Sequence, residues 1–194
     1  MKLKLVHLAF VTLLVNCLNA QNLLGENTGF SEKDKFWVTG SWGDEKGKPE
    51  GDFYVSQNKG QDGKSGFMRV EVTKPTINAD GFKLFVKKEG IKLKKKKTYK
   101  LVFWVASTVR QDHIGARIYS GPDTGSNSPW APVMDKTFAF EGNKKWQRLE
   151  YIFAARSLWA DKEANLSNLA FVLGFDKRVG PYHVDNISLE RVKR

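Results

Sequence analysis

The middle of the chain reads Tyr99-Lys100-Leu101-Val102-Phe103-Trp104-Val105-Ala106-Ser107, and this stretch decides the fold. Every second residue from Tyr99 to Val105 is large and apolar, and these side chains share one face of an extended chain. Valine, phenylalanine, tyrosine and tryptophan suit a pleated surface that is half buried. The stretch therefore predicts a β-strand with one face in the core.

The same alternation recurs in residues 67–72 and 148–153. Apolar runs of similar length, separated by turn residues, cover residues 53–56, 67–73, 82–86, 99–107, 116–120, 137–140, 146–154, 169–175 and 182–192. About nine or ten strands at hairpin spacing predict an all-β fold, a two-sheet antiparallel β-sandwich. Only residues 156–168 could hold a short helix.

The first twenty residues have the order of a secretory signal peptide. A basic start at Lys2 and Lys4 precedes an apolar run over residues 5–15, and Ala20 offers a small residue for cleavage. The run is too short to span a bilayer, and no other segment comes close to that length. We expect a secreted chain whose mature part, residues 21–194, is one β-sandwich domain, large enough to have a core of its own.

Cys17 leaves a second possibility open. Residues 14–17 loosely resemble a bacterial lipobox, whose cysteine would be lipidated and held at a membrane, but Asn16 is a poor match to that pattern. Cleavage after Ala20 is favoured, and it removes the only cysteine of the chain. The mature domain then contains no disulfide.

The net charge of +11, which falls to +9 without the two signal lysines, points to an acidic partner. Export argues against nucleic acid and leaves an anionic surface or an anionic glycan. The lysine run at residues 94–97, near Lys87, Lys88 and Lys92, is either an anion-binding ridge or a solvated turn.

Five motifs in order carry a resemblance to a known family. They are Asn22-Leu23-Leu24-Gly25-Glu26-Asn27-Thr28-Gly29-Phe30, Lys97-Thr98-Tyr99-Lys100-Leu101, Trp146-Gln147-Arg148-Leu149-Glu150-Tyr151, Leu169-Ala170-Phe171-Val172-Leu173-Gly174 and Tyr182-His183-Val184-Asp185-Asn186-Ile187-Ser188-Leu189. Together they resemble the jelly-roll carbohydrate-binding modules of the family 4, 9 and 22 group. Two departures are Ser31, where the group usually has Glu, and a long polar insert within residues 115–133.

This resemblance implies a galactose-binding-like jelly roll and a structural calcium ion held partly by Asp185. Calcium needs several oxygen ligands, so Glu32 or Glu26 would have to compensate for Ser31, or the site would stay empty. The resemblance also implies a sugar cleft on one sheet, with a glycoside hydrolase as a partner enzyme.

Sugar rings stack on exposed aromatic side chains, and their hydroxyls bind planar polar groups. Alternation places Arg117 and Tyr119 on the face opposite Ala116 and Ile118, so we predict Tyr119 as a stacking aromatic with Arg117 beside it. Further candidates are Phe82, Trp130 and Trp42, each of which could equally belong to the core. The predicted ligand is a β-glucan, a xylan or an anionic glycan.

A catalytic function has little support in the sequence. The mature chain contains only two histidines, His113 and His183, and no motif with paired carboxylates is evident. A small lyase or hydrolase would need His113 or Glu150 to face Tyr119. A structural or adhesive sandwich that binds protein is the other alternative, because a jelly roll alone does not specify function.

Overall fold

The computed structural model describes residues 21–25, 28–33, 35, 37–41, 49–75, 84–109, 113–120, 131–160, 163–175 and 178–193. Its ten strands are β1 (Val38–Ser41), β2 (Glu50–Lys59), β3 (Ser65–Lys74), β4 (Leu84–Ile91), β5 (Thr98–Ser107), β6 (His113–Ser120), β7 (Ala131–Ala139), β8 (Gln147–Ala154), β9 (Leu169–Gly174) and β10 (Gly180–Arg191). In its described part, each of the nine predicted runs overlaps a strand, and β1 is an addition that the pattern did not reveal. Residues 156–160 and 163–168 form turns rather than the short helix that was allowed for.

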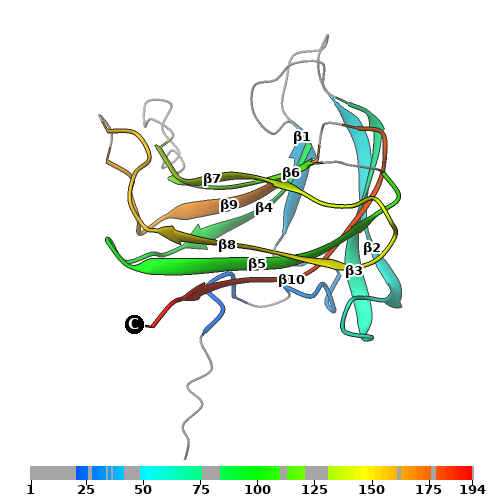
Figure 1. Cartoon of the computed structure of the whole chain (residues 1–194), viewed down its shortest axis with the longest axis horizontal. Helices are drawn as coiled ribbons and strands as arrows, with labels where there is room; N and C mark the ends of the chain where they lie inside the picture. The colour runs from blue at the N-terminus through cyan, green and yellow to red at the C-terminus, as the bar shows by residue number, and fades with distance from the viewer. Residues whose placement is uncertain are drawn as a thin grey trace, which may run out of the picture.

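The strands form two antiparallel sheets of five that face each other (Figure 1). The first sheet has the order β1-β4-β9-β6-β7, and the second has the order β2-β3-β10-β5-β8. Apart from the consecutive pairs β6–β7 and β2–β3, neighbouring strands in each sheet are distant in sequence, as expected for a jelly roll. The predicted two-sheet β-sandwich is therefore confirmed. Within the described ranges, no helix is long and apolar enough to span a membrane.

The core lies between the sheets and is built from the alternating residues that the sequence identified. Leu101 and Phe103 of β5 are fully buried against Phe171 and Leu173 of β9, in one continuous apolar cluster. Burial of each such side chain contributes about 2 kcal/mol. The residues between them in sequence therefore point outward, and both sheets present an outer face.

The start of the described chain is fastened to the last strand. The Asn22 side-chain amide donates to the Ile187 carbonyl (3.0 Å), and the Leu189 N–H donates back to Asn22 Oδ1 (3.0 Å). The Leu23 N–H also donates to the Leu189 carbonyl at 2.8 Å. These bonds make the Asn-Leu-Leu motif a brace for β10.

Tyr99 fastens the turn between β4 and β5. Its hydroxyl accepts a 2.7 Å hydrogen bond from the Lys94 backbone N–H, and its ring is buried. We expect Tyr99→Phe to lower the free energy of unfolding by about 1 kcal/mol, because a part-buried donor loses its acceptor. Urea denaturation would measure this, with Tyr54→Phe as the control because Tyr54 is exposed. An unchanged midpoint in Tyr99→Phe would show that water replaces the hydroxyl.

Candidate functional site

The outer face of the first sheet carries Arg117 and Tyr119, two of the residues that the sequence predicted for binding. One row crosses all five strands because each member is the register partner of the next. This central row consists of Val38, Lys87, Val172, Arg117 and Asp135. Each strand thus contributes one side chain to a line across the sheet.

Two ion pairs set the chemistry of the central row. Arg117 donates from Nε (3.0 Å) and Nη2 (2.7 Å) to one carboxylate oxygen of Asp135. Lys87 Nζ lies 2.6 Å from Glu89 Oε1, two residues along the same strand and therefore on the same face. These charged groups are partly exposed, so they present fixed donors and acceptors to solvent.

In the adjacent row on this face, three neighbouring positions are glycines and one is Phe85. Phe85 is flanked in the register by Gly40 and Gly174, with Gly115 beyond. The ring lies over Gly40, where an added Cβ would come within 3.0 Å of Phe85 Cζ. The glycines leave this part of the sheet flat around the ring.

Tyr119 lies on the predicted face but is not exposed. Only 3% of its surface is accessible, and it forms a small buried cluster with Phe85, Ala170 and Val172 that is separate from the main core. The expectation that Tyr119 is solvent-facing is therefore wrong, while its role in ligand binding stays a prediction. Burial raises the pKa of the Tyr119 phenol, and the negative charge of Glu89 raises it further. The phenol is consequently protonated at neutral pH and can act as a hydrogen-bond donor.

The burial of the other predicted aromatic residues is not described. Phe82, Trp130 and Trp42 lie outside the described residues, as does Glu26, and so do the signal segment and Cys17. Their proposed roles stay predictions.

The predicted lysine ridge is not continuous. Lys87 belongs to the central row, whereas Lys88 is buried with its Nζ 5.6 Å from the centroid of the Trp37 ring. Lysines 94–97 are exposed on the turn between β4 and β5. The positive charge of this turn thus belongs to one end of the sandwich and not to the outer face of the first sheet.

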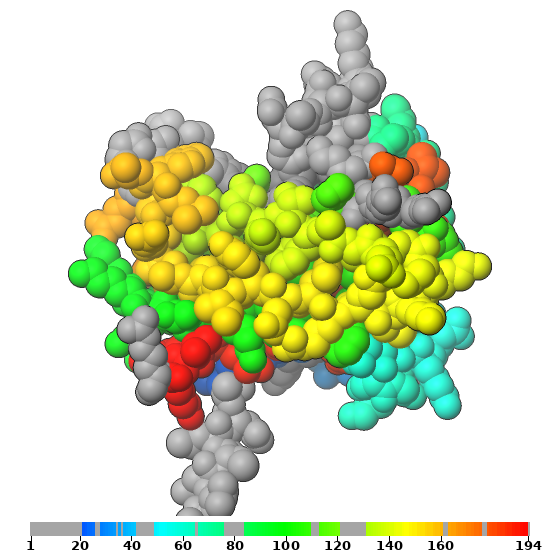
Figure 2. All heavy atoms as spheres, in the orientation of Figure 1, coloured from blue at the N-terminus to red at the C-terminus, as the bar shows by residue number. Residues whose placement is uncertain are grey.

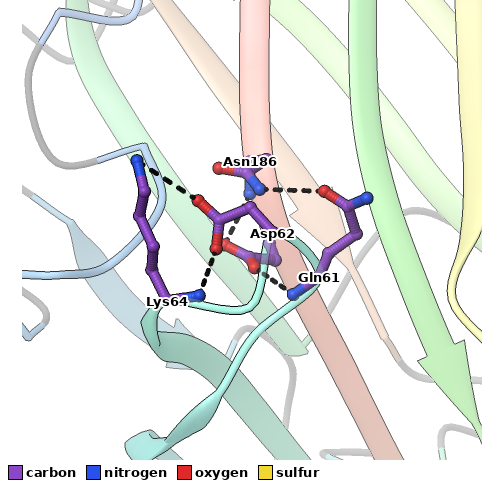
Figure 3. A network of polar contacts seen from close by, with 5 residues as sticks. Gln61, Asp62, Lys64 and Asn186 are labelled. Atoms are coloured by element: carbon purple, nitrogen blue, oxygen red, sulfur yellow. Dashed lines mark hydrogen bonds and ion pairs between the residues drawn. The ribbon is translucent and has the colours of Figure 1, made fainter.

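Asp185 lies in a second polar cluster, on β10 of the other sheet. One carboxylate oxygen accepts from the Gln61 N–H and the other from the Asn186 N–H, both at 2.8 Å. The Asn186 side chain donates to Gln61 Oε1 at 3.1 Å, and Asp62 pairs with Lys64 beside them (Figure 3). Only 1% of Asp185 is exposed. The turn between β2 and β3 therefore covers this carboxyl group.

Burial raises the pKa of Asp185 to about 6. The two backbone hydrogen bonds lower this pKa, and the negative charge of Asp62 makes a smaller contribution that raises it. A raised carboxyl pKa means that the surrounding groups do not fully compensate the negative charge. This carboxylate is the one buried acid among the described side chains.

The calcium expectation can be compared with the side chains around Asp185. Within the described ranges, no group of three or more His, Cys, Asp or Glu side chains is placed so that it could hold a metal ion. Both oxygens of Asp185 already accept hydrogen bonds, and Glu32 is paired with Lys35 at 2.8 Å. One carboxylate is rarely enough for calcium. The calcium ion stays a prediction.

Three functional candidates were missed by sequence reasoning. Asp135 could not be matched to Arg117 because a long insert separates their strands, and Phe85 was read only as part of an apolar run. Trp159 lies in a turn that was assigned to a weak helix. Its signal was available, since a tryptophan outside any predicted strand is a candidate for exposure.

Protein-family models and curated proteins give no match to this sequence. Solved structures do match it. A family 4 carbohydrate-binding module aligns with a TM-score of 0.62 at 15% identity, over 86% of this chain and 98% of the module. A family 16 carbohydrate-binding module aligns with a TM-score of 0.55 at 14% identity, over 89% of this chain and all of the module.

A tandem of two family 22 modules from Paenibacillus barcinonensis aligns with a TM-score of 0.57 at 15% identity, over 89% of this chain and 50% of the tandem. This chain therefore corresponds in extent to one module. At these identities the likeness shows the fold: the chain is an antiparallel β-sandwich of the jelly-roll type that these carbohydrate-binding modules share.

Proposed function

We propose that the chain is a non-catalytic carbohydrate-binding protein that holds a polysaccharide against the outer face of the first sheet. The observation that carries the proposal is the central row, in which Arg117–Asp135 and Lys87–Glu89 lie on either side of Val172. Sugar hydroxyls bind such planar, hydrogen-bonded polar groups. The shared fold with carbohydrate-binding modules supports the same function.

The places of His113 and Glu150 argue against the lyase or hydrolase that the sequence left open. His113 shares the face with Tyr119 but lies six residues away along β6, about 20 Å. Glu150 belongs to β8 of the other sheet, where it pairs with Arg148 on the outer side. Neither residue meets Tyr119, as a lyase or hydrolase on this sheet would require.

The ligand class that fits best is a neutral β-glucan or xylan, with an anionic glycan as the second possibility. The donors and acceptors of the central row are paired with one another, so the row carries little net charge among its described members. Export through the signal peptide of residues 1–20 would bring the protein to such polysaccharides. A partner glycoside hydrolase would then act on the polymer that is held.

Affinity electrophoresis in gels containing soluble β-glucan or xylan tests this function. We expect Arg117→Ala to weaken retardation about tenfold, because a hydrogen-bonded cation and the orientation of Asp135 are lost together. Arg69→Ala is a matched control. Arg69 pairs with Glu71 at the same 2.7 Å and with similar exposure (36% and 30%, against 29% and 40% for Arg117 and Asp135), but on the second sheet.

Retardation that survives in Arg117→Ala, or that falls equally in Arg69→Ala, would contradict binding on this face. Tyr119→Ala belongs in the same gels. Because Tyr119 is buried, this change removes support beneath the face, and we expect a weaker effect than for an exposed stacking residue.

The burial of Tyr119 and Phe85 favours one other function, a structural or adhesive sandwich that contacts protein. That alternative predicts no retardation by any polysaccharide, neutral or anionic, in the wild-type protein.

A further inference from the structure

A second candidate binding site lies at one end of the sandwich, away from the central row. The segment between β8 and β9 and the turn between β4 and β5 line an open pocket of about 1030 Å³. Arg156, Trp159, Asn165 and Ser167 line it from the first segment, and Lys95 lines it from the second. In Figures 1 and 2 the two segments, orange and green, lie at the left end of the molecule.

Trp159 gives the pocket an aromatic surface. Its side chain is 42% exposed, although tryptophan is usually well buried. The backbone that carries it is held on both sides: Ser157 Oγ accepts from the Trp159 N–H (3.2 Å) and donates to the Trp159 carbonyl (3.1 Å), and the Leu158 N–H donates to the Pro132 carbonyl (2.8 Å). The indole is therefore presented on a fixed backbone, which reduces the entropy cost of binding.

The surroundings of Trp159 are strongly positive. The turn between β4 and β5 contributes five lysines, residues 92 and 94–97, all of them exposed, and Arg156 adds an exposed guanidinium. Glu163 is the one acid among the residues that line the pocket. Lys95 pairs with it, and the hydrogen bond from Lys95 lowers the pKa of this carboxyl. Asp161 and Lys162, which precede Glu163 in the sequence, have opposite formal charges that cancel.

The lysine turn and the tryptophan segment are fastened to each other. The Leu93 N–H donates to the Leu166 carbonyl (2.8 Å), the Lys96 N–H to the Ala155 carbonyl (3.0 Å), and the Ala155 N–H to the Lys97 carbonyl (2.8 Å). Lys95 and Arg156 thus line one pocket with the indole, and hydrogen bonds hold the two segments that carry them in a set geometry. Positive charges are held close together here, so the local electrostatic potential is positive and attracts an anion.

From this surface we infer a second glycan site, which takes an acidic sugar such as a uronate or a sulfated residue. The sugar ring stacks on Trp159, its carboxylate or sulfate lies against Arg156 and the exposed lysines, and its hydroxyls bind Asn165 and Ser167. The inference does not depend on the central row, because no residue is shared between the two places.

Affinity electrophoresis with polygalacturonate, alginate and dextran sulfate, at low and high salt, tests the inference. We expect the wild-type protein to be retarded by at least one of these polymers. Trp159→Ala should lower that retardation about tenfold and Arg156→Ala several-fold, while Trp159→Phe keeps most of it. High salt should reduce the lysine contribution and leave the stacking contribution. Leu158→Ala, at the equally exposed neighbour that does not line the pocket, is the control.

The two proposals fail separately in this design. Arg117→Ala should leave polygalacturonate retardation unchanged, and Trp159→Ala should leave that by neutral xylan or β-glucan unchanged. Retardation by duplex DNA as strong as that by the acidic polysaccharides, and unaffected by Trp159→Ala, would overturn the inference in favour of nonspecific binding of polyanions by the lysines. Absence of retardation by any acidic polymer would overturn it as well.

Discussion

Gly60→Ala is expected to lower the free energy of unfolding by about 3 kcal/mol or more. A Cβ at this position would lie 2.3 Å from Asp185 Oδ2 and 2.7 Å from the Gly66 carbonyl oxygen, so the turn between β2 and β3 must move away from β10. That movement strains the 2.8 Å bond from the Gln61 N–H to Asp185. A buried carboxylate that loses a hydrogen bond is costly.

Gly63→Ala provides the matched control in the same turn. Gly63 has a φ of +78° but open space around it, so its substitution costs only the backbone strain of about 1 kcal/mol. Urea unfolding followed by tryptophan fluorescence would compare the two variants with the wild type. Equal losses in both would show that the turn yields easily and that Asp185 does not depend on close packing by Gly60.

The wild-type protein is expected to lose about 3 kcal/mol of stability through Asp185 between about pH 4 and about pH 7. The folded pKa of this carboxyl is about 6, and its ordinary value is 3.8. The folded state therefore binds the proton more tightly than the unfolded chain does. The stability contributed by that proton is present at low pH and is lost as the pH rises through about 6.

Asp185→Asn isolates this effect. The amide cannot titrate, and its NH₂ group meets the Gln61 N–H, which costs a constant amount at every pH. Denaturation across the pH range should show the advantage of the wild type over the variant shrinking as pH rises. His183 acts in the opposite direction, because burial lowers its pKa and stability is lost as pH falls through its range, but it is present in both proteins and cancels.

Parallel curves for the two proteins would mean that the Asp185 carboxyl has an ordinary pKa. Repeating the series with added calcium and with EDTA also tests the predicted metal. A bound cation would lower the pKa of Asp185, flatten the wild-type curve and raise stability most above pH 6.

The sandwich could be predicted from sequence because side-chain alternation is a local signal. The faces of 67–72, 99–105 and 116–120 all agree with the structure, since a strand that is one residue out of register would bury its polar face. β1 escaped prediction because Val38–Ser41 is short and contains a glycine. A strand at the edge of a sheet can form without a long alternating apolar pattern, because the neighbouring strand provides its hydrogen-bond partners.

The candidate site could be predicted only as far as the face on which its residues lie. Alternation placed Arg117 and Tyr119 together, but exposure depends on what packs over a residue from distant parts of the chain. Tyr119 is buried with Phe85 and Val172, which belong to two other strands. The pairing of Arg117 with Asp135, and the meeting of Trp159 with the lysine turn, likewise depend on tertiary contacts without a local signal.

The place of β10 has a consequence for how the chain folds during synthesis. This last strand lies between β3 and β5 at the centre of the second sheet, and Asn22 fastens the other end of the chain to it. While the polypeptide is still emerging, β3 and β5 lack their shared partner and expose unpaired edges. The second sheet can close only after residues 180–191 are available, and until then two of its strands lack the partner that joins them.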